Sequence, residues 1–142
     1  MNGTGVRDVK NHVVQDALDH IGPRPYASGM PLPTCLSASE AAAINEFVAA
    51  ARAMLGPDLR EARLFGSRAR GEGHEHSDID IALIVSAGGR ARRYELYDVS
   101  FDIGLRHGVE LAPLVIEESR LRELEARERL IAFDIATQGI AL

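Results

Sequence analysis

Two neighbouring stretches decide the fold, and they read Leu64-Phe65-Gly66-Ser67-Arg68-Ala69-Arg70-Gly71 and Ser77-Asp78-Ile79-Asp80-Ile81-Ala82-Leu83-Ile84-Val85. Each contains a short apolar run typical of a buried strand, which predicts strands over 61–66 and 77–85. Between them, residues 67–71 are predicted to form a turn that opens a brief helix. The two stretches therefore predict a pair of strands with polar residues where one strand ends and the next begins.

Gly66 and Ser67 stand at the end of the first predicted strand. A glycine lets backbone N–H groups approach a phosphate closely, and Ser67 adds a hydroxyl at the start of the expected helix, where free amides favour an anion. Arg68 and Arg70 follow within reach, and one of them can neutralise a triphosphate oxygen. These four residues predict a phosphate-binding turn.

Asp78 and Asp80 are two residues apart on a predicted strand, so both carboxylates project from the face opposite Ile79. Carboxylates about 7 Å apart along a strand can share two Mg²⁺ ions lying ~4 Å apart. An isolated Asp-any-Asp is more often a pair of solvated acids. Here the pair opens an apolar strand ten residues after Gly66-Ser67, which favours metal-dependent nucleotidyl transfer.

The rest of the chain predicts an α/β arrangement with few strands. Ser37 and Glu40 form a capping-box signature at the start of an apolar helical stripe that runs to Leu55. The pattern also predicts a strand over 109–116, a helix over 119–138 before Gly139, and a loop at 88–90. The stretch 92–106 fits a helix and a strand equally well.

Composition excludes several classes of protein. The chain has 142 residues, 46% of them hydrophobic, which favours a single folded domain. The single cysteine excludes a disulfide framework, and the net charge of −5 gives no basic footprint for DNA. We find no secretory leader and no apolar run long enough for a membrane. We therefore expect a cytoplasmic protein that binds neither DNA nor membranes.

Residues 1–35 are predicted to be an N-terminal arm: a helix over 6–21, then a connector rich in proline and glycine. Residues 36–142 form the predicted main domain. Translation from Met30 remains an alternative, because the residues singled out above all follow it.

The Gly-Ser, ten residues, Asp-any-Asp pattern resembles that of the nucleotidyltransferases of the DNA polymerase beta superfamily, and the chain's size is similar to that of the minimal nucleotidyltransferases. The resemblance covers about 36–142 and is most specific over 66–85. It implies an α/β (α+β) fold with a small mixed sheet and helices packed on one side, in which 92–106 is a helix. It also implies a third carboxylate on the next strand, where it helps to bind the catalytic metal and can accept a proton. Glu110 matches that position, although the family normally has aspartate there.

The resemblance further implies Mg²⁺-dependent transfer of AMP from ATP to an acceptor hydroxyl, with release of pyrophosphate. Stand-alone minimal nucleotidyltransferases are commonly antitoxins of HEPN-domain ribonucleases, which implies a tyrosine of such a toxin as acceptor. Two alternatives remain: a small-molecule adenylyltransferase of the aminoglycoside-modifying type, and a non-catalytic antitoxin that acts by binding alone. The sequence also leaves a homo-oligomer open.

Other chemistry-bearing residues are expected to be structural. Cys35 is expected to be a buried thiol, because no nearby feature lowers its pKa. His74 and His76 are expected to lie in a polar loop. The aromatic side chains of the stretch 92–106 are expected in the core, and they are Tyr94, Tyr97 and Phe101.

Overall fold

The computed structural model describes residues 32–33, 35–72, 77–127 and 129–142. The predicted helix over 6–21, most of the connector after it, and the loop residues His74 and His76 lie outside the described residues. The boundary between residues 35 and 36 and the alternative start at Met30 therefore stay predictions.

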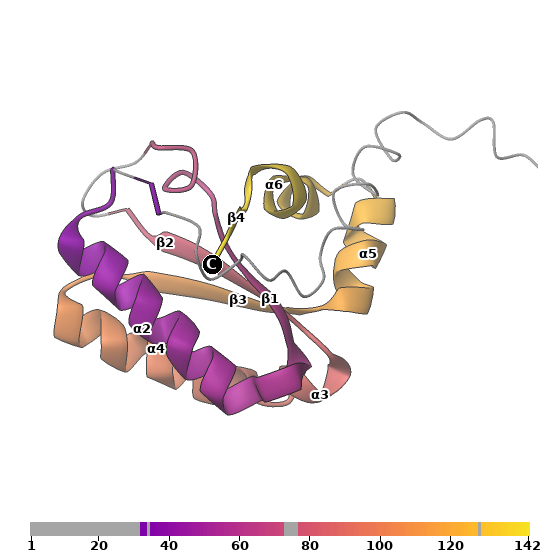
Figure 1. The fold of residues 1–142 in the computed structure, drawn as a ribbon. Helices are drawn as coiled ribbons and strands as arrows, with labels where there is room; N and C mark the ends of the chain where they lie inside the picture. Colours follow the sequence, from indigo (N-terminus) through magenta and orange to yellow (C-terminus); the bar gives the residue numbers. More distant parts are fainter. Residues whose placement is uncertain (1–31, 34, 73–76, 128) are drawn as a thin grey trace, which may run out of the picture.

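A four-stranded mixed sheet forms the centre of the fold (Figure 1). Its order is β3-β2-β1-β4, and the strands span Leu59–Phe65 (β1), Ile79–Val85 (β2), Leu111–Glu117 (β3) and Ile140–Ala141 (β4). β1 is antiparallel to β2 and β4, whereas β3 is parallel to β2. The mixed sheet confirms the fold prediction, and β4 is a strand that the sequence pattern did not indicate.

Helix α2 (Ala38–Leu55) begins and ends as its sequence predicts. The side chain of Ser37 accepts a hydrogen bond from the backbone N–H of Glu40, and the Glu40 side chain accepts one from the N–H of Ser37. This is the capping box expected from the sequence. At the other end Gly56 has φ +53°, and the short helix η3 (Gly56–Asp58) leads into β1.

The ambiguous stretch forms helix α4 (Arg93–His107), which crosses from β2 to the parallel strand β3. A parallel pair needs a long crossover, so topology settles what periodicity left open. Before it, the predicted loop at 88–90 is replaced by the short helix α3 (Ala87–Arg90).

The aromatic residues of α4 correct one expectation. The buried face of this helix consists of Leu96, Ser100, Ile103 and Gly104. Tyr94 and Phe101 are 65% and 66% exposed, so their placement in the core was wrong. A helix buries only one stripe, and the stripe that α4 buries leaves both of these rings outside it. Gly104 belongs to this stripe, and a Cβ there would overlap the carbonyl oxygen of Val109 in the link to β3.

The single helix predicted over 119–138 is two helices, α5 (Glu118–Ala126) and α6 (Leu130–Gln138). The carbonyl of Leu124 accepts hydrogen bonds from the N–H groups of Arg127 and Arg129, which ends α5. The break lets two short helices pack onto one hydrophobic cluster, which a straight helix of that length would overshoot.

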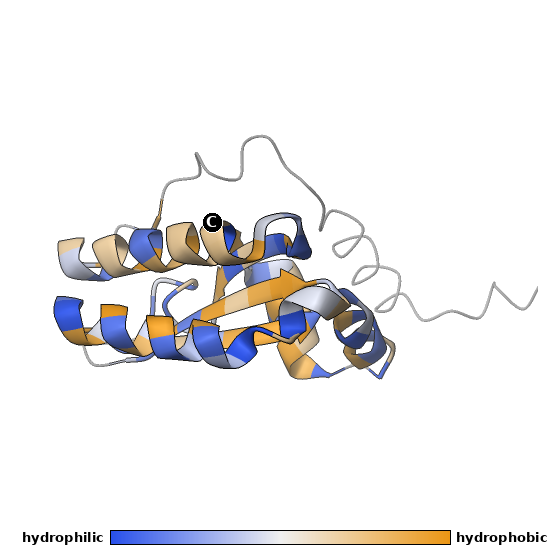
Figure 2. Cartoon of the chain, turned by 90° about the horizontal axis from the view of Figure 1, so that it is seen from below, coloured by the Kyte–Doolittle hydropathy of each residue, from blue (hydrophilic) through white to orange (hydrophobic). Residues whose placement is uncertain are grey.

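The sheet separates two hydrophobic clusters of different size. The two long helices α2 and α4 cover one face, and the short helices α5 and α6 cover part of the other (Figure 1). The prediction of helices on one side thus describes α2 and α4, and the structure adds the second pair. The strands are drawn largely in orange in Figure 2, in agreement with their burial. No helix in the described part of the chain is both long and apolar enough to span a membrane.

Candidate active site

The end of β1 leads into a tight turn over residues 66–71. Gly66 and Gly71 have φ values of +76° and +77°, in the left-handed region that glycine adopts most readily. The carbonyl of Gly66 accepts hydrogen bonds from the N–H groups of Ala69 and Arg70, and the carbonyl of Ser67 accepts one from Glu72 at 2.9 Å. The expected brief helix is absent here, because the two left-handed glycines bracket the turn. Ser67 therefore lies in a turn and not at a helix N-terminus.

The carboxylate of Asp80 lies directly against the backbone of Gly66. Phe65, the last residue of β1, pairs with Asp80 across the antiparallel ladder. A Cβ on Gly66 would lie 3.2 Å from Asp80 Cγ and would overlap one carboxylate oxygen. Gly66 is thus required twice, for its positive φ and for the space that Asp80 occupies.

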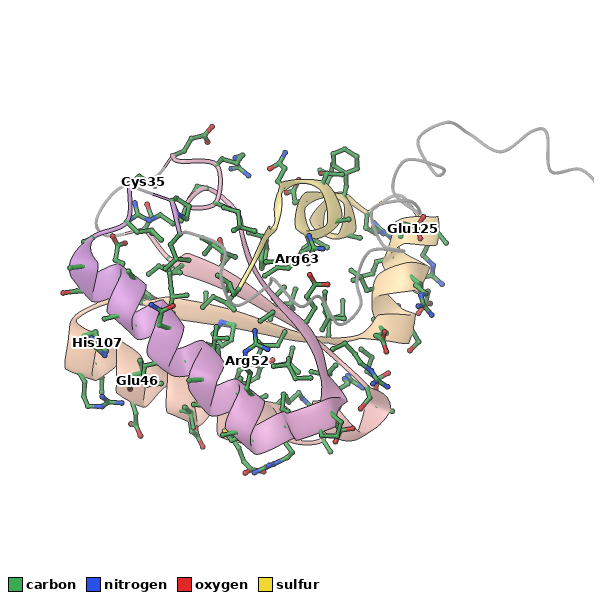
Figure 3. All side chains as sticks on the ribbon, viewed as in Figure 1. Cys35, Glu46, Arg52, Arg63, His107 and Glu125 are labelled. Carbon is green, nitrogen blue, oxygen red and sulfur yellow. The ribbon has the colours of Figure 1, made fainter. Side chains whose placement is uncertain are left out.

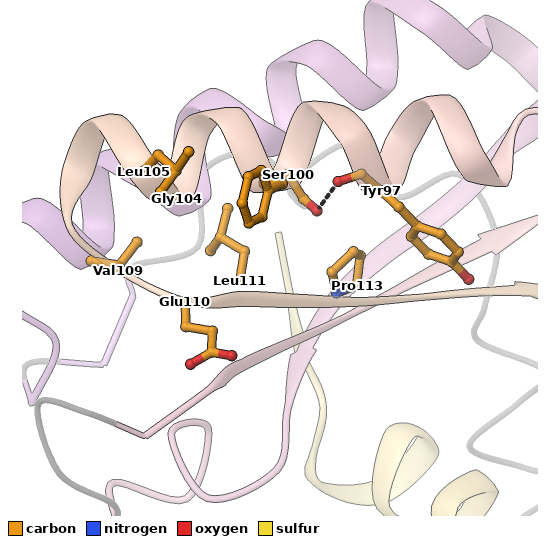
Figure 4. Close-up of a pocket in the computed structure, with 9 residues that line it drawn as sticks. Tyr97, Ser100, Gly104, Leu105, Val109, Glu110, Leu111 and Pro113 are labelled. Atoms are coloured by element: carbon orange, nitrogen blue, oxygen red, sulfur yellow. Dashed lines mark hydrogen bonds between the residues drawn. The ribbon is translucent and has the colours of Figure 1, made fainter.

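Asp78, Asp80 and Glu110 lie on one face of the sheet, at the end where β2 and β3 begin. Ile79 pairs with Leu111 and Asp80 with Ala112, and the N–H of Ile79 donates to the carbonyl of Glu110 at 2.9 Å. Continuing this register by one residue places Glu110 beside Asp78, about 4.8 Å away across the ladder. Figure 4 shows the Glu110 side chain on the opposite side of β3 from Leu111 and from helix α4. The three carboxylates therefore share the face that α5 and α6 cover only in part.

The local electrostatics of Asp80 differ from those of a solvated acid. Partial burial raises the pKa of the Asp80 carboxyl, and the negative charge of Asp78 raises it further. The guanidinium of Arg70 acts in the opposite direction. Asp78 and Asp80 repel each other when both are ionised, and a bound cation would offset that repulsion.

The two predicted phosphate-binding arginines have different surroundings. Arg70 is exposed, lies near enough to influence Asp80, and donates a hydrogen bond to the side chain of Gln138 at 3.1 Å. Arg68 is buried, and its guanidinium pairs with the carboxylate of Glu40. Arg70 also pairs with Glu72 at 3.4 Å, and because both of its partners are surface side chains, a ligand can reach its guanidinium. Arg68 is already paired inside the protein, so its predicted contact with phosphate stays a prediction.

Cys35 contacts the turn over residues 66–71. Its residue is exposed, which corrects the expectation of a buried thiol, and its S–H donates to the carbonyl of Arg68 at 3.8 Å. In Figure 3 Cys35 lies near the beginning of α2. Cys35 and Glu40 therefore both contact Arg68 of this turn.

The carboxylates at this site are the kind of ligand that a hard cation prefers. Among the described residues no group of three His, Cys, Asp or Glu side chains is already arranged around a metal position. Asp78 and Asp80 nevertheless offer carboxylate oxygens, the ligands that Mg²⁺ prefers. Their mutual repulsion, which shows in the raised pKa of Asp80, is what a divalent ion would offset.

Sequence reasoning missed a groove on the other side of β3. It has a volume of about 470 Å³ and lies between α4 and β3, with Tyr97, Phe101 and Leu105 along its helical wall. Glu110 is at its end, but the carboxylate of Glu110 is directed to the opposite side of the strand (Figure 4). Phe101 lines this groove and was the residue in the sequence that could have indicated it. Its helical spacing predicted a place in the core, whereas the ring is exposed.

Comparison with known proteins agrees with this geometry. Residues 53–142 match the family model described as Polymerase beta, Nucleotidyltransferase. The chain is also 35% identical over 78 residues to a protein of Methanocaldococcus jannaschii whose name reads "Putative protein adenylyltransferase". That match covers 52% of this chain and 52% of the relative, so the chain spans about half of the relative's length. No solved structure matches the chain.

Proposed function

The chain belongs to the polymerase beta nucleotidyltransferase family, and on that premise we propose that it transfers AMP from ATP, with Mg²⁺, to a hydroxyl of a partner protein. We propose that the acceptor is a tyrosine of a HEPN-type toxin, that the modification makes this chain an antitoxin, and that the reaction takes place in the cytoplasm. The printed name of the archaeal relative supports a protein acceptor.

One observation carries the proposal: the Asp80 carboxylate lies against the backbone of Gly66, on the same face as Asp78 and Glu110. A carboxylate that we propose binds metal thus lies beside a turn that we propose binds phosphate. A surface used only for binding has no need of a left-handed glycine and an acid with a raised pKa in contact.

Each residue of the site has an expected task. Asp78 and Asp80 would hold Mg²⁺, which supplies neutralisation of triphosphate charge when bound. Ser67 would bind phosphate oxygens through its hydroxyl, because the N–H groups of residues 69–72 are already bonded within the turn, and Arg70 would contact the leaving pyrophosphate.

The chemical step forms a bond between the acceptor oxygen and the α-phosphorus of ATP. The bond between the α-phosphorus and the bridging oxygen to the β-phosphate breaks, and pyrophosphate leaves with that electron pair. The acceptor hydroxyl loses its proton, and Glu110 is the carboxylate that we propose takes it. Glu110 is exposed on the site face, so an acceptor can reach it from solvent.

A protein acceptor suits the open face. The helices α5 and α6 cover the far end of the sheet face and leave Asp78 and Glu110 exposed. An open face does not enclose a small acceptor by itself, whereas a partner protein can complete it.

The test is transfer of label from α-labelled ATP, with Mg²⁺, to a HEPN-domain protein supplied as the proposed partner. Wild type is compared with Asp80→Asn and with the matched variant Asp98→Asn, which changes an exposed aspartate on α4. We expect label on the partner with wild type and Asp98→Asn, and at least a ~1,000-fold lower rate with Asp80→Asn. Toxin neutralised by Asp80→Asn as well as by wild type would instead support an antitoxin that acts by binding alone. Label on an added aminoglycoside and none on the partner protein would support a small-molecule adenylyltransferase.

A further inference from the structure

A buried ion pair connects helix α2 to the turn over residues 66–71, which is called the phosphate turn below. The guanidinium of Arg68 contacts the carboxylate of Glu40, and the two side chains are only 4% and 6% exposed. Glu40 belongs to the first turn of α2, whereas Arg68 is in the middle of the turn over 66–71. The pair therefore joins two segments that are 28 residues apart in the sequence.

The Glu40 carboxylate has two tasks. One oxygen accepts the N–H of Ser37 at 2.8 Å and closes the capping box, and the other oxygen accepts from Arg68. The position of this carboxylate is thus fixed by the start of a long, well-packed helix. Arg68 is thereby paired with a fixed point and not with a mobile surface acid.

Arg68 depends on this partner. Its Nε is buried and has no hydrogen-bond partner among the described residues, so Glu40 is the compensating charge that the structure shows for the guanidinium. Removing one member of a buried pair leaves an uncompensated charge, which is strongly unfavourable. The turn therefore cannot shift without moving this arginine relative to Glu40.

The backbone of Arg68 is held as well. Its carbonyl accepts the N–H of Gly71 at 3.3 Å and the S–H of Cys35 at 3.8 Å. Ser67 precedes Arg68 directly, and Arg70 follows two residues later. Contacts that hold residue 68 therefore also limit the movement of the adjoining backbone, which carries the two side chains proposed to bind the phosphates.

We infer that Glu40 and Arg68 are positioning residues that hold the phosphate turn in its ATP-binding geometry. The inference rests on the proposed function for its effect on ATP, but the rigidity of the turn is measurable without ATP. It assigns a role in the site to Glu40, which precedes the part of the chain matching the family model.

The sharpest variant is Glu40→Gln. A glutamine side-chain oxygen still accepts the N–H of Ser37, so the capping box is kept while the charge opposite Arg68 is lost. We expect the KM for ATP to rise about tenfold with a smaller change in kcat, because the turn loses its fixed position. Amide hydrogen exchange at residues 69–72, whose N–H groups are bonded within the turn, is expected to accelerate by a similar factor.

Two controls separate positioning from general stability. Ser37→Ala removes one cap hydrogen bond and keeps the pair, so it is expected to lower Tm and leave the KM for ATP unchanged. Glu46→Gln removes an ion pair from the same helix, because Glu46 contacts Arg106 and His107 on the surface (Figure 3). It is expected to leave both the KM for ATP and the exchange rate at residues 69–72 within about twofold of wild type.

The inference is overturned if Glu40→Gln is folded and shows wild-type KM for ATP and wild-type exchange at residues 69–72. If too little Glu40→Gln folds, Glu40→Gln with Arg68→Met removes both charges, a change that buried pairs tolerate better. Faster exchange in that double variant supports the inference, and unchanged exchange contradicts it. A wild type that transfers no label while exchange responds to Glu40→Gln counts against the proposed function alone.

Discussion

The two faces of the sheet are built differently. The face covered by α2 and α4 is packed with aliphatic side chains, and Phe47, Ile44 and Leu83 on it have no exposed surface. The face covered by α5 and α6 has a smaller cluster and gives way to carboxylates at the start of β2 and β3. One face therefore stabilises the fold, and the other leaves room for chemistry without loss of the core.

The largest expected effect of a substitution that tests this difference is on stability. Phe47→Ala removes a fully buried ring from the α2 and α4 face and is expected to lower the free energy of unfolding by about 3–5 kcal/mol. Phe133→Ala, at a phenylalanine 40% exposed on α6, is expected to lower it by about 1 kcal/mol or less. Urea unfolding measures both. Equal losses would mean that the ring of Phe133 is buried in solution as fully as that of Phe47, and that α6 is packed as tightly as α2.

The next effect is on transfer and concerns the site face. Gly66→Ala places a methyl group on the Asp80 carboxylate, so we expect transfer to fall by at least about 100-fold. Gly71→Ala is the matched control, because its φ of +77° imposes the same backbone strain while nothing lies within 4 Å of the new Cβ. It is expected to destabilise the protein by about 1 kcal/mol and to retain most activity. Similar activity in the two variants would show that backbone strain, and not the contact with Asp80, matters.

A smaller effect follows from the charge of Asp80. Its folded pKa is raised above the unfolded value by burial and by Asp78, so ionisation lowers stability: stability is greater below the unfolded pKa and is lost as pH rises through the folded pKa. Asp80→Asn is therefore expected to raise Tm at pH 7 by about 2 °C while transfer is lost. Asp78→Asn should lower the pKa of Asp80 and move this transition to lower pH.

Thermal unfolding from pH 3 to 8 checks the sign, with Asp98→Asn as control. Mg²⁺ is expected to raise the Tm of wild type and not that of Asp80→Asn, because a ligand that binds the folded state stabilises it. A lower Tm for Asp80→Asn at pH 7 would contradict the view that this carboxylate is held at a cost to stability.

The parts that the sequence predicted are those with local causes. The capping box and the strands β1 and β2 each depend on residues that are close in the chain or in one hairpin-like register. The contact of Gly66 with Asp80 follows from that register and was not predicted. The split of 119–138 into two helices depends on where the sheet ends beneath them, which no local period contains.

Long-range pairing explains the rest of the site. Arg68 resembles a phosphate ligand in the sequence, and only the fold brings Glu40 to it from 28 residues away. The exposure of Phe101 likewise depends on which stripe of α4 the sheet accepts. A sequence pattern can indicate that a charged or aromatic residue has a role, but the residue that it contacts depends on how the folded chain packs.

The substitution with the smallest expected effect on stability is in β3, at the edge of the sheet. β3 is an edge strand, and the N–H of Ile79 donates to Glu110, so the parallel register directs the backbone of Ala112 toward β2 and that of Pro113 away from it. The missing N–H of Pro113 is thus on the open edge, where no ladder bond is lost. Pro113→Ala is expected to change the free energy of unfolding by less than about 1 kcal/mol. Ala112→Pro removes an inward donor one residue earlier and is expected to destabilise by about 3 kcal/mol in the same urea titration. If Ala112→Pro cost no more than Pro113→Ala, the N–H of Ala112 would not donate to β2, and β3 would pair in a register other than the one that the structure shows.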